Sequence, residues 1–229
     1  MLFNPAGGLR YHLRAALSHE RWAPFRAGVS RWLETQWNPS ERRLVIVGPS
    51  GGYCLEPSFL ERFEEIVCID PDPLAELIFK LRLPRPLARR VRWIRGDAFE
   101  QEIPNQGYAL LFSNFLGQLS VIHEEEAELS ARKRRVTALL ASRAGSWASF
   151  HDRVSGPVAP ELPREGVRES RRLSDAEIIE RFYQRTSGAR VELVDHRTEG
   201  LFEASRTHDY FAWALRPGQH HLIEATRRP

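Results

Sequence analysis

The chain has 229 residues, of which 42% are hydrophobic and 28% are charged, and its formal net charge is +3. This composition excludes a disordered chain, and the length allows one domain that buries about 70% of its unfolded surface. No apolar run approaches the ~20 residues that cross a bilayer. The first ten residues contain no long apolar stretch of the kind that directs export, so we expect a cytoplasmic protein.

The positive charge is spread along the chain. Lys80 and Lys133 are the only lysines among 33 basic residues, and 30 acidic residues offset the total. The one dense basic run, residues 132–135, follows the acidic residues 124–126 within one predicted helix, where side chains three or four positions apart neutralise each other. We therefore favour a solvated helix face over a phosphate-binding patch, with RNA as the alternative partner.

Cysteine and histidine spacing predicts no metal site. Cys54 and Cys68 are too few for a disulfide framework or a four-ligand zinc site. Cys68 stands among apolar residues of a predicted strand and is interpreted as a core residue. The eight histidines include the pair His220 and His221, whose spacing matches no metal-binding motif.

Residues 1–43 are predicted to form a helical extension that precedes one domain over residues 44–229. Phe25, Trp32 and Leu33 recur at the spacing of one helix face. We favour a helix that packs this aromatic face on the sheet of the domain. The alternative is a cap over a substrate site.

The segment from residue 44 to residue 70 has the layout of a nucleotide-binding βαβ unit. Residues 44–47 (Leu-Val-Ile-Val) predict a buried strand, and the glycine-rich residues 48–52 follow at once. A helix is expected over residues 53–65, in which Pro57 marks an interruption or the beginning, and a second strand over 66–69 ends on Asp70. Glycines let the backbone approach a ligand closely, and an acid at a strand end can accept hydrogen bonds from ribose hydroxyls.

The turn has neither the G-x-G-x-x-G spacing of dinucleotide-binding proteins nor the G-K-[ST] of a P-loop. It resembles the cofactor loop of class I S-adenosylmethionine-dependent methyltransferases, with Asp70 at the place of their ribose-binding acid. The resemblance covers residues 44–150. Ser50 stands where that family usually has a glycine, and Ile46 where many members have an acid. The resemblance implies a Rossmann-like, mostly parallel sheet of seven strands between helices.

Two acids follow the second strand and are expected to have different roles. Asp70 is assigned to the ligand, whereas Asp72 followed by Pro73 is typical of a helix N-cap and first helical position. That helix is predicted to end near Pro84. Its buried face is expected to consist of Leu74, Leu77, Ile78 and Leu81.

The third and fourth strands are predicted over residues 91–94 and 108–112. Asp97 and Ala98 follow the third strand, and the resemblance implies that the acid meets the adenine amino group while its neighbour packs on the ring. Asn114 follows the fourth strand. Methyltransferases that act on amino groups have two prolines after such an asparagine, and this chain has none there, so their amine chemistry is not transferred.

The fifth strand is predicted over residues 147–150 and ends at His151 and Asp152. An imidazole is half-protonated near pH 6.5 and can take a proton at neutral pH. His151 is therefore the candidate base on the acceptor side, with Asp152 or another acid orienting it. The competing interpretation, which we favour, is a turn in which both residues are structural.

The rest of the chain completes the sheet. A charged helix is predicted over residues 124–142, a surface loop or lid over 155–172, and a helix that opens with a capping box formed by Ser174 and Glu177. The remaining strands are predicted at residues 191–195, 209–215 and 220–225, with a turn at 216–219.

The resemblance implies a methyltransferase that binds S-adenosylmethionine and acts on a small-molecule acceptor. Three alternatives remain: cofactor binding without catalysis, an interaction protein with an empty crevice, and an RNA methyltransferase. The expected cofactor-binding residues are Gly48, Ser50, Gly51, Asp70, Asp97, Ala98 and Asn114, and the expected catalytic residues are His151 and Asp152.

Overall fold

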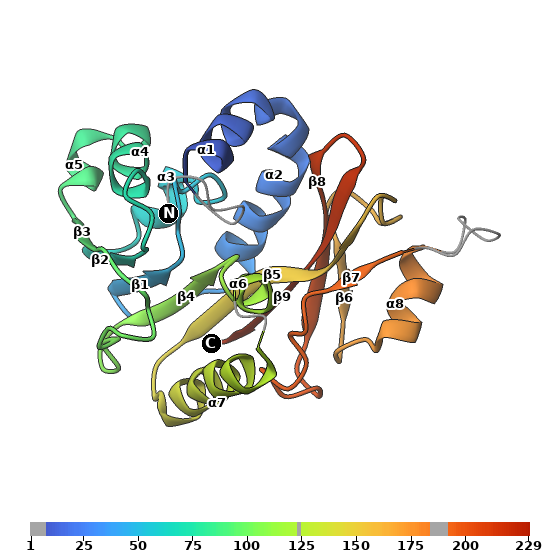
Figure 1. Ribbon diagram of the computed structural model, residues 1–229. Helices are drawn as coiled ribbons and strands as arrows, with labels where there is room; N and C mark the ends of the chain where they lie inside the picture. The colour runs from blue at the N-terminus through green and yellow to red at the C-terminus, as the bar shows by residue number, and fades with distance from the viewer. Residues whose placement is uncertain (1–7, 123–124, 184–191) are drawn as a thin grey trace.

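The computed structural model describes residues 8–122, 125–183 and 192–229 (Figure 1). Parts of three predicted elements lie outside these ranges: the start of the N-terminal helical extension, residue 124 and residue 191. Within the described ranges the strands form one sheet in the order β3-β2-β1-β4-β5-β9-β8-β6, and β7 pairs with β5 beyond the end of β4. The strands are β1 (Arg43–Val47), β2 (Glu65–Ile69), β3 (Val91–Ile94), β4 (Ala109–Ser113), β5 (Trp147–Gly156), β6 (Val167–Glu169), β7 (Val194–Asp195), β8 (His208–Arg216) and β9 (Gln219–Arg228).

The predicted Rossmann-like sheet is confirmed, although the described part has nine strands rather than seven. Strands β1 to β5 are parallel to one another, and β9, β8 and β6 continue the sheet from β5 in antiparallel pairs. The additional strands are short. Part of the predicted loop 155–172 forms β6 along the edge of β8, so this segment belongs to the sheet rather than forming only a surface loop or lid.

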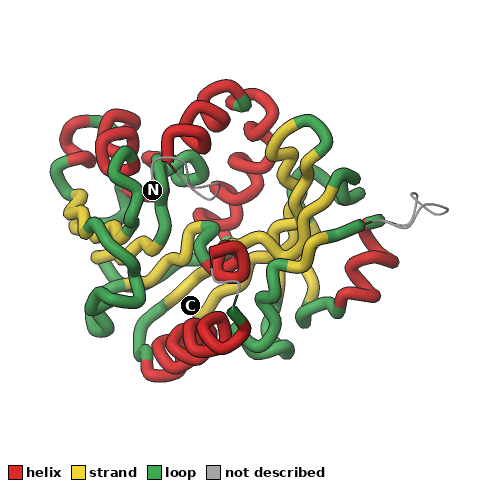
Figure 2. Tube along the Cα trace, in the orientation of Figure 1, coloured by secondary structure: helices red, strands yellow, loops and turns green. Residues whose placement is uncertain are grey.

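Helices cover both faces of the sheet (Figures 1 and 2). None of the described helices is long and apolar enough to cross a membrane. The α-helices are α1 (Gly8–Leu17), α2 (His19–Thr35), α3 (Pro57–Leu60), α4 (Ala75–Arg82), α5 (Arg85–Ala88), α6 (Leu119–Ile122), α7 (Glu126–Ser142) and α8 (Asp175–Phe182), and a 3₁₀ helix, η1, spans Leu116–Gln118.

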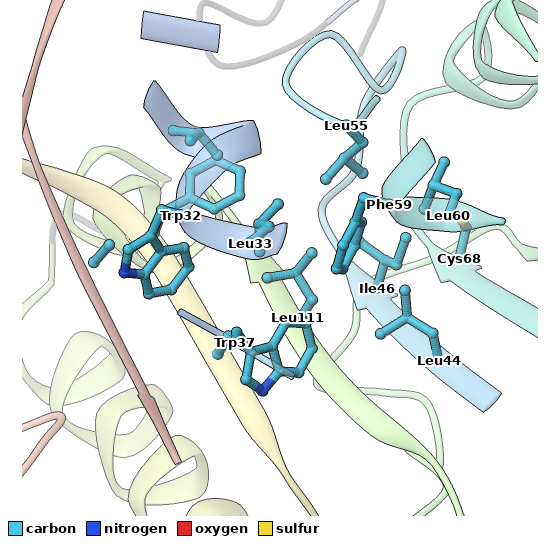
Figure 3. Packing of buried hydrophobic residues seen from close by; sticks show 14 of the residues in the cluster. Trp32, Leu33, Trp37, Leu44, Ile46, Leu55, Phe59, Leu60, Cys68 and Leu111 are labelled. Atoms are coloured by element: carbon cyan, nitrogen blue, oxygen red, sulfur yellow. The ribbon is translucent and has the colours of Figure 1, made fainter. Parts of the chain in front are cut away.

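Helix α2 packs its aromatic face on the sheet, as predicted. Figure 3 shows Trp32, Leu33 and Trp37 against Ile46 of β1 and Leu111 of β4, all of them buried. The indole of Trp32 donates a hydrogen bond of 2.8 Å to Asp209 on β8, so the helix is held by a polar contact as well. Truncation of a buried leucine such as Leu33 to alanine costs about 2–5 kcal/mol.

The opposite face of the parallel strands packs on α7. Val45 and Val47 of β1 and Leu110 of β4 share a buried cluster with Leu129 and Val136 of α7. Residues that alternate with these along the strands, such as those in Figure 3, face the other side, so β1, β2 and β4 are buried on both faces. This arrangement explains the continuous apolar runs in the sequence.

Two predicted helices differ from the structure. The helix expected over 53–65 reduces to the single turn of α3, which begins at Pro57, because β2 starts at Glu65 and leaves little chain for a longer helix. The buried face of helix α4 differs from the predicted one, because Ala75 and Phe79 are buried. Leu77 and Leu81, which were predicted to face the core, are 61% and 75% exposed.

Candidate active site

The glycine-rich turn after β1 lies close to the loop after β4. Gly48 and Ser50 have left-handed backbones, with φ values of 70° and 49°. A Cβ on Gly48 would lie 2.9 Å from Cβ of Phe115, so the turn needs a glycine to pass this loop. Gly51 has a different constraint, because a Cβ there would lie 2.8 Å from side-chain atoms of Ile78 and Tyr53.

Asp70 lies directly behind this turn, at the end of β2. Its Oδ2 accepts a 2.8 Å hydrogen bond from the backbone N–H of Ser50, and its Oδ1 accepts one of 2.9 Å from the N–H of Asp72. Burial raises the pKa of Asp70 to about 6, and the nearby charge of Asp72 adds to this rise. A carboxylate has about four acceptor positions, so two backbone donors leave capacity for a ligand with hydroxyl groups.

The side chain of Ser50 is also available to a ligand. Its Oγ is buried and has no hydrogen-bond partner in the described residues. Buried polar atoms are normally paired, so an orphaned hydroxyl beside Asp70 fits a site for a polar ligand. The glycine turn, the strand-end acid and this hydroxyl together fit the ribose and amino-acid portions of an adenosyl cofactor.

Asp72 holds the N-terminal helix against this edge of the sheet. Its Oδ1 accepts a 2.9 Å hydrogen bond from the N–H of Leu74, just before α4, so it caps the turn into the helix although the helix itself begins at Ala75. Its Oδ2 accepts from the N–H of Gly8 at 2.6 Å and from Nε2 of His12 at 3.0 Å. The two acids therefore have different partners, and Asp72 joins α1 to the end of β2.

Tyr11 of α1 lies within electrostatic range of acids at two strands of the sheet. Burial raises the pKa of Tyr11 well above its usual value, and the charges of Cys54, Asp152 and Asp70 raise it further. The phenol is therefore within electrostatic range of Asp70, which follows β2, and of Asp152, which lies on β5.

The residues after β3 are partly engaged within the protein. Oδ2 of Asp97 lies 2.6 Å from Nη1 of Arg132 on α7, and its Oδ1 accepts a hydrogen bond from the N–H of Phe99. Ala98, Phe99 and Phe115 line a largely apolar cavity of about 140 Å³ beside α7. Ala98 thus lies against an aromatic, apolar space, whereas Asp97 is tied to α7.

Asn114 connects the end of β4 to Asp152 on β5. Its backbone is left-handed, with a φ of 52°, and its N–H bonds to the carbonyl of Phe150. The Asn114 side chain accepts from the N–H of Asp152 at 3.1 Å, and its Nδ2 lies 3.4 Å from Oδ2 of the same residue. Asn114, which was predicted to bind the cofactor, is therefore in direct contact with Asp152, which was predicted to be catalytic.

Asp152 is fully buried among polar side chains. Its Oδ1 lies 2.7 Å from Nδ1 of His221, and its Oδ2 accepts a 2.5 Å hydrogen bond from Gln118. Burial alone would raise the pKa of Asp152, but the neighbouring His221 and His196 outweigh it and hold the pKa at about 2. The carboxylate is thus ionised across the physiological range.

His151 and Asp152 do not act as a pair, because β5 continues through both residues and successive side chains of a strand point to opposite faces. His151 is fully buried, stacks on Phe202 and lies 3.4 Å from Oε2 of Glu224. Burial lowers the pKa of His151 despite Glu224. The acid beside this imidazole is Glu224, and Arg172 binds the same carboxylate through two nitrogens. His151 therefore belongs to a buried network behind the sheet.

Sequence reasoning missed the two histidines that lie beside Asp152. His221 lies on β9, and His196 directly follows β7. Nδ1 of His196 lies 2.8 Å from the carbonyl of Gly117, and its Nε2 lies 3.0 Å from Oγ of Ser155. The pairing of β5 with both β7 and β9 brings these segments together, and no local motif in the sequence encodes that pairing.

The basic run on α7 is largely engaged in contacts with the protein. Besides the contact of Arg132 with Asp97, Lys133 lies 3.1 Å from Oε1 of Glu199, and Arg135 donates to the carbonyl of Phe99. The face is therefore less solvated than predicted, with the Arg132 side chain 17% and the Lys133 side chain 20% exposed, and these contacts leave less charge for phosphates.

Comparisons with known proteins support the fold. No family model and no curated protein matches the chain. Among solved structures, a candidate O-methyltransferase from Nostoc punctiforme PCC 73102 superposes with a TM-score of 0.50 at 15% identity. The match covers 95% of this chain and 59% of the other. The chain has a methyltransferase fold.

Two further structures are similar over most of their length. The DhpI–SAM–HEP complex gives a TM-score of 0.49 at 14% identity, with 96% of this chain and 94% of the other covered. The N-methyltransferase NodS from Bradyrhizobium japonicum WM9, in complex with S-adenosyl-L-homocysteine, gives 0.49 at 10% identity, with 90% and 87% covered.

The residues described above lie at the edge of the sheet where this fold forms its ligand-binding crevice. Strand β1 lies between β2 and β4, so the chain crosses to opposite sides of β1 and opens a crevice at the carboxyl ends of these strands. Gly48, Asp70 and Asn114 follow β1, β2 and β4 at this edge, and Asn114 brings Asp152 to it.

Proposed function

We propose that the protein transfers a methyl group from S-adenosylmethionine to a small-molecule acceptor. The observation that carries the proposal is Asp70, a buried carboxylate at the β2 end whose hydrogen-bond donors among the described residues are backbone N–H groups beside the glycine turn. This environment keeps acceptor capacity for a ribose diol. The methyltransferase fold supports the choice of cofactor over other nucleotides.

The residues on the β1 and β2 side would hold the cofactor. Asp70 would accept from the ribose hydroxyls, and Gly48 and Ser50 would line the cofactor along the turn. Ala98 would pack on the adenine, next to the apolar cavity after β3. When bound, the cofactor supplies an activated methyl group, so the protein contributes position and the exclusion of water.

Asp152 is the residue that we assign to the acceptor side. With a pKa of about 2 it is too weak a base to take a proton from a hydroxyl at neutral pH, because an effective general base has a pKa near the working pH. Its role would be to orient a group that carries hydrogen-bond donors or positive charge. His151, buried behind the sheet beside Glu224, is not part of this proposal.

Thermal unfolding with added ligand tests the proposal. S-adenosylmethionine and S-adenosylhomocysteine should each raise the melting temperature, since a ligand at about 100 times its Kd adds roughly 2.7 kcal/mol of stability. NAD serves as the control nucleotide and should produce no comparable shift. An equal shift with NAD, or none with millimolar adenosyl ligands, contradicts the proposal. Binding without methyl transfer to any of a panel of acceptors would limit the function to cofactor binding.

A further inference from the structure

We propose that Asp152, His196 and His221 form a binding site for a divalent transition-metal ion. One ligand atom from each side chain lies within 4.8 Å of the other two, and all three residues are buried. They come from β5, from the residue after β7 and from β9, so the sheet itself fixes their arrangement. Metal binding would not depend on the proposed methyl transfer, since none of these residues is assigned to the adenosyl cofactor.

The surroundings of His196 orient it as a ligand. A carbonyl oxygen only accepts hydrogen bonds, so the contact with Gly117 places the proton of the neutral imidazole on Nδ1. Nε2 then carries the lone pair, and its contact in the described residues is the rotatable hydroxyl of Ser155. Metal-binding histidines commonly donate their second N–H to a carbonyl in this way, which fixes the tautomer.

The carboxylate of Asp152 is also held in a fixed orientation in which it can bind a cation. Gln118 donates to its Oδ2 at 2.5 Å, and Asn114 holds the backbone N–H of the same residue. These amides fix the orientation of the carboxylate without neutralising its charge. A buried anion that is oriented by amides and lies beside two imidazoles is suited to a metal ion.

The hydrogen bond of His221 indicates which of its ring nitrogens carries a proton. Its Nδ1 lies 2.7 Å from Oδ1 of Asp152, and a carboxylate accepts, so this nitrogen carries a proton in the metal-free protein. A metal ion that binds Nδ1 and the carboxylate together must displace that proton. In a neutral imidazole that proton moves to Nε2, so His221 would bind the ion as its other tautomer.

The ligand types select the class of ion. Two imidazoles and one carboxylate suit zinc, iron, cobalt or nickel, whereas magnesium and calcium prefer an all-oxygen shell. Three protein ligands also leave at least one coordination position open, as in catalytic rather than structural zinc sites. A small molecule with an oxygen or nitrogen donor could occupy that position.

Titration of the full-length protein with Co²⁺ tests the site directly. We expect visible d–d absorption that saturates at one ion per chain and disappears when Zn²⁺ is added. Mg²⁺ should neither bind with comparable affinity nor compete.

Variants locate the ion. His196→Gln and Asp152→Asn should each weaken Co²⁺ binding by more than about 100-fold, and Ser155→Ala by at most about 10- to 100-fold, the range for groups outside the ligand shell. His220→Gln is the matched control, because His220 is adjacent on the same strand and is not in the cluster. Circular dichroism verifies that each variant is folded.

The proposal is overturned if wild-type protein shows no saturable Co²⁺ absorption. It is equally overturned if folded His196→Gln binds Co²⁺ as tightly as wild type, or if His220→Gln abolishes binding. Failure of adenosyl ligands to bind does not affect this test, which contains metal alone.

Discussion

Asp70 and Asp152 are both buried aspartates at the same edge of the sheet, yet their acidities are shifted in opposite directions. The pKa of Asp70 is raised to about 6 by burial, and its hydrogen-bond donors are two backbone N–H groups. Asp152 is at least as buried, but His221 and His196 outweigh the burial and hold its pKa at about 2.

The difference shows that the groups around each aspartate, rather than its depth of burial, set its pKa and therefore its role. Asp70 has neutral backbone donors and one nearby acid, so a ligand with hydroxyl groups improves its environment. Asp152 already has side-chain donors on both oxygens, so its negative charge is stabilised by the protein without a ligand. Pairs of carboxylates whose environments separate their pKa values commonly have separate functions.

The largest expected effect comes from removing the charge of Asp152. Asp152→Asn leaves His221 without its carboxylate partner and places an amide against Gln118 and Asn114, so the free energy of unfolding should fall by roughly 3–5 kcal/mol. Urea denaturation measures this loss. Glu64→Gln is the control, because the Arg42–Glu64 pair is 70% and 63% exposed and its loss should cost less than about 1 kcal/mol. Equal effects of the two variants would mean that the Asp152 cluster contributes no special stability.

The second prediction concerns the pH dependence that Asp70 imposes. Folding raises its pKa from the ordinary value of 3.8 to about 6, so the folded state binds the proton more tightly, which corresponds to about 3 kcal/mol. This contribution is fully present below about pH 3.8 and is lost as the pH rises through about 6. Denaturation of wild type and Asp70→Asn across this window should therefore show wild type losing about 3 kcal/mol relative to the variant. Parallel pH profiles would show that the raised pKa of Asp70 is wrong.

A smaller effect should follow from the acid next to Asp70 in the same turn. Asp72→Ala removes the acceptor for Leu74 and the contacts to Gly8 and His12, so stability should fall by about 0.5–2 kcal/mol, the range for a lost cap. Its affinity for S-adenosylhomocysteine should change less than that of Asp70→Asn. Hydrogen exchange would show faster exchange in α1 of the variant, and unchanged exchange there would contradict the assigned contacts.

The sequence predicts the part of the molecule in which neighbours along the chain are neighbours in space. The strand over 44–47, the glycine turn and the acid at Asp70 form one continuous segment, and the structure keeps them together. The capping box of Ser174 and Glu177 is local in the same sense and is confirmed.

Features that depend on pairing between distant strands could not be predicted in this way. The length of β5 decides which face His151 occupies, and that length comes from pairing with β9. His196 and His221 reach Asp152 only through β7 and β9, and periodicity along the chain carries no signal for this contact. The exposed leucines of α4 show that an apolar face can be misassigned when the neighbouring element is unknown.

Calorimetric titration with S-adenosylhomocysteine tests the division between the two aspartates most directly. Wild type should bind one molecule per chain, and Asp70→Asn should bind it roughly 10- to 100-fold more weakly, since a hydrogen bond to a charged group contributes about 1.5–3 kcal/mol. Folded Asp152→Asn should bind it with nearly unchanged affinity. No binding to wild type, or equal affinity for wild type and Asp70→Asn, would contradict the assignment of the cofactor site to the end of β2.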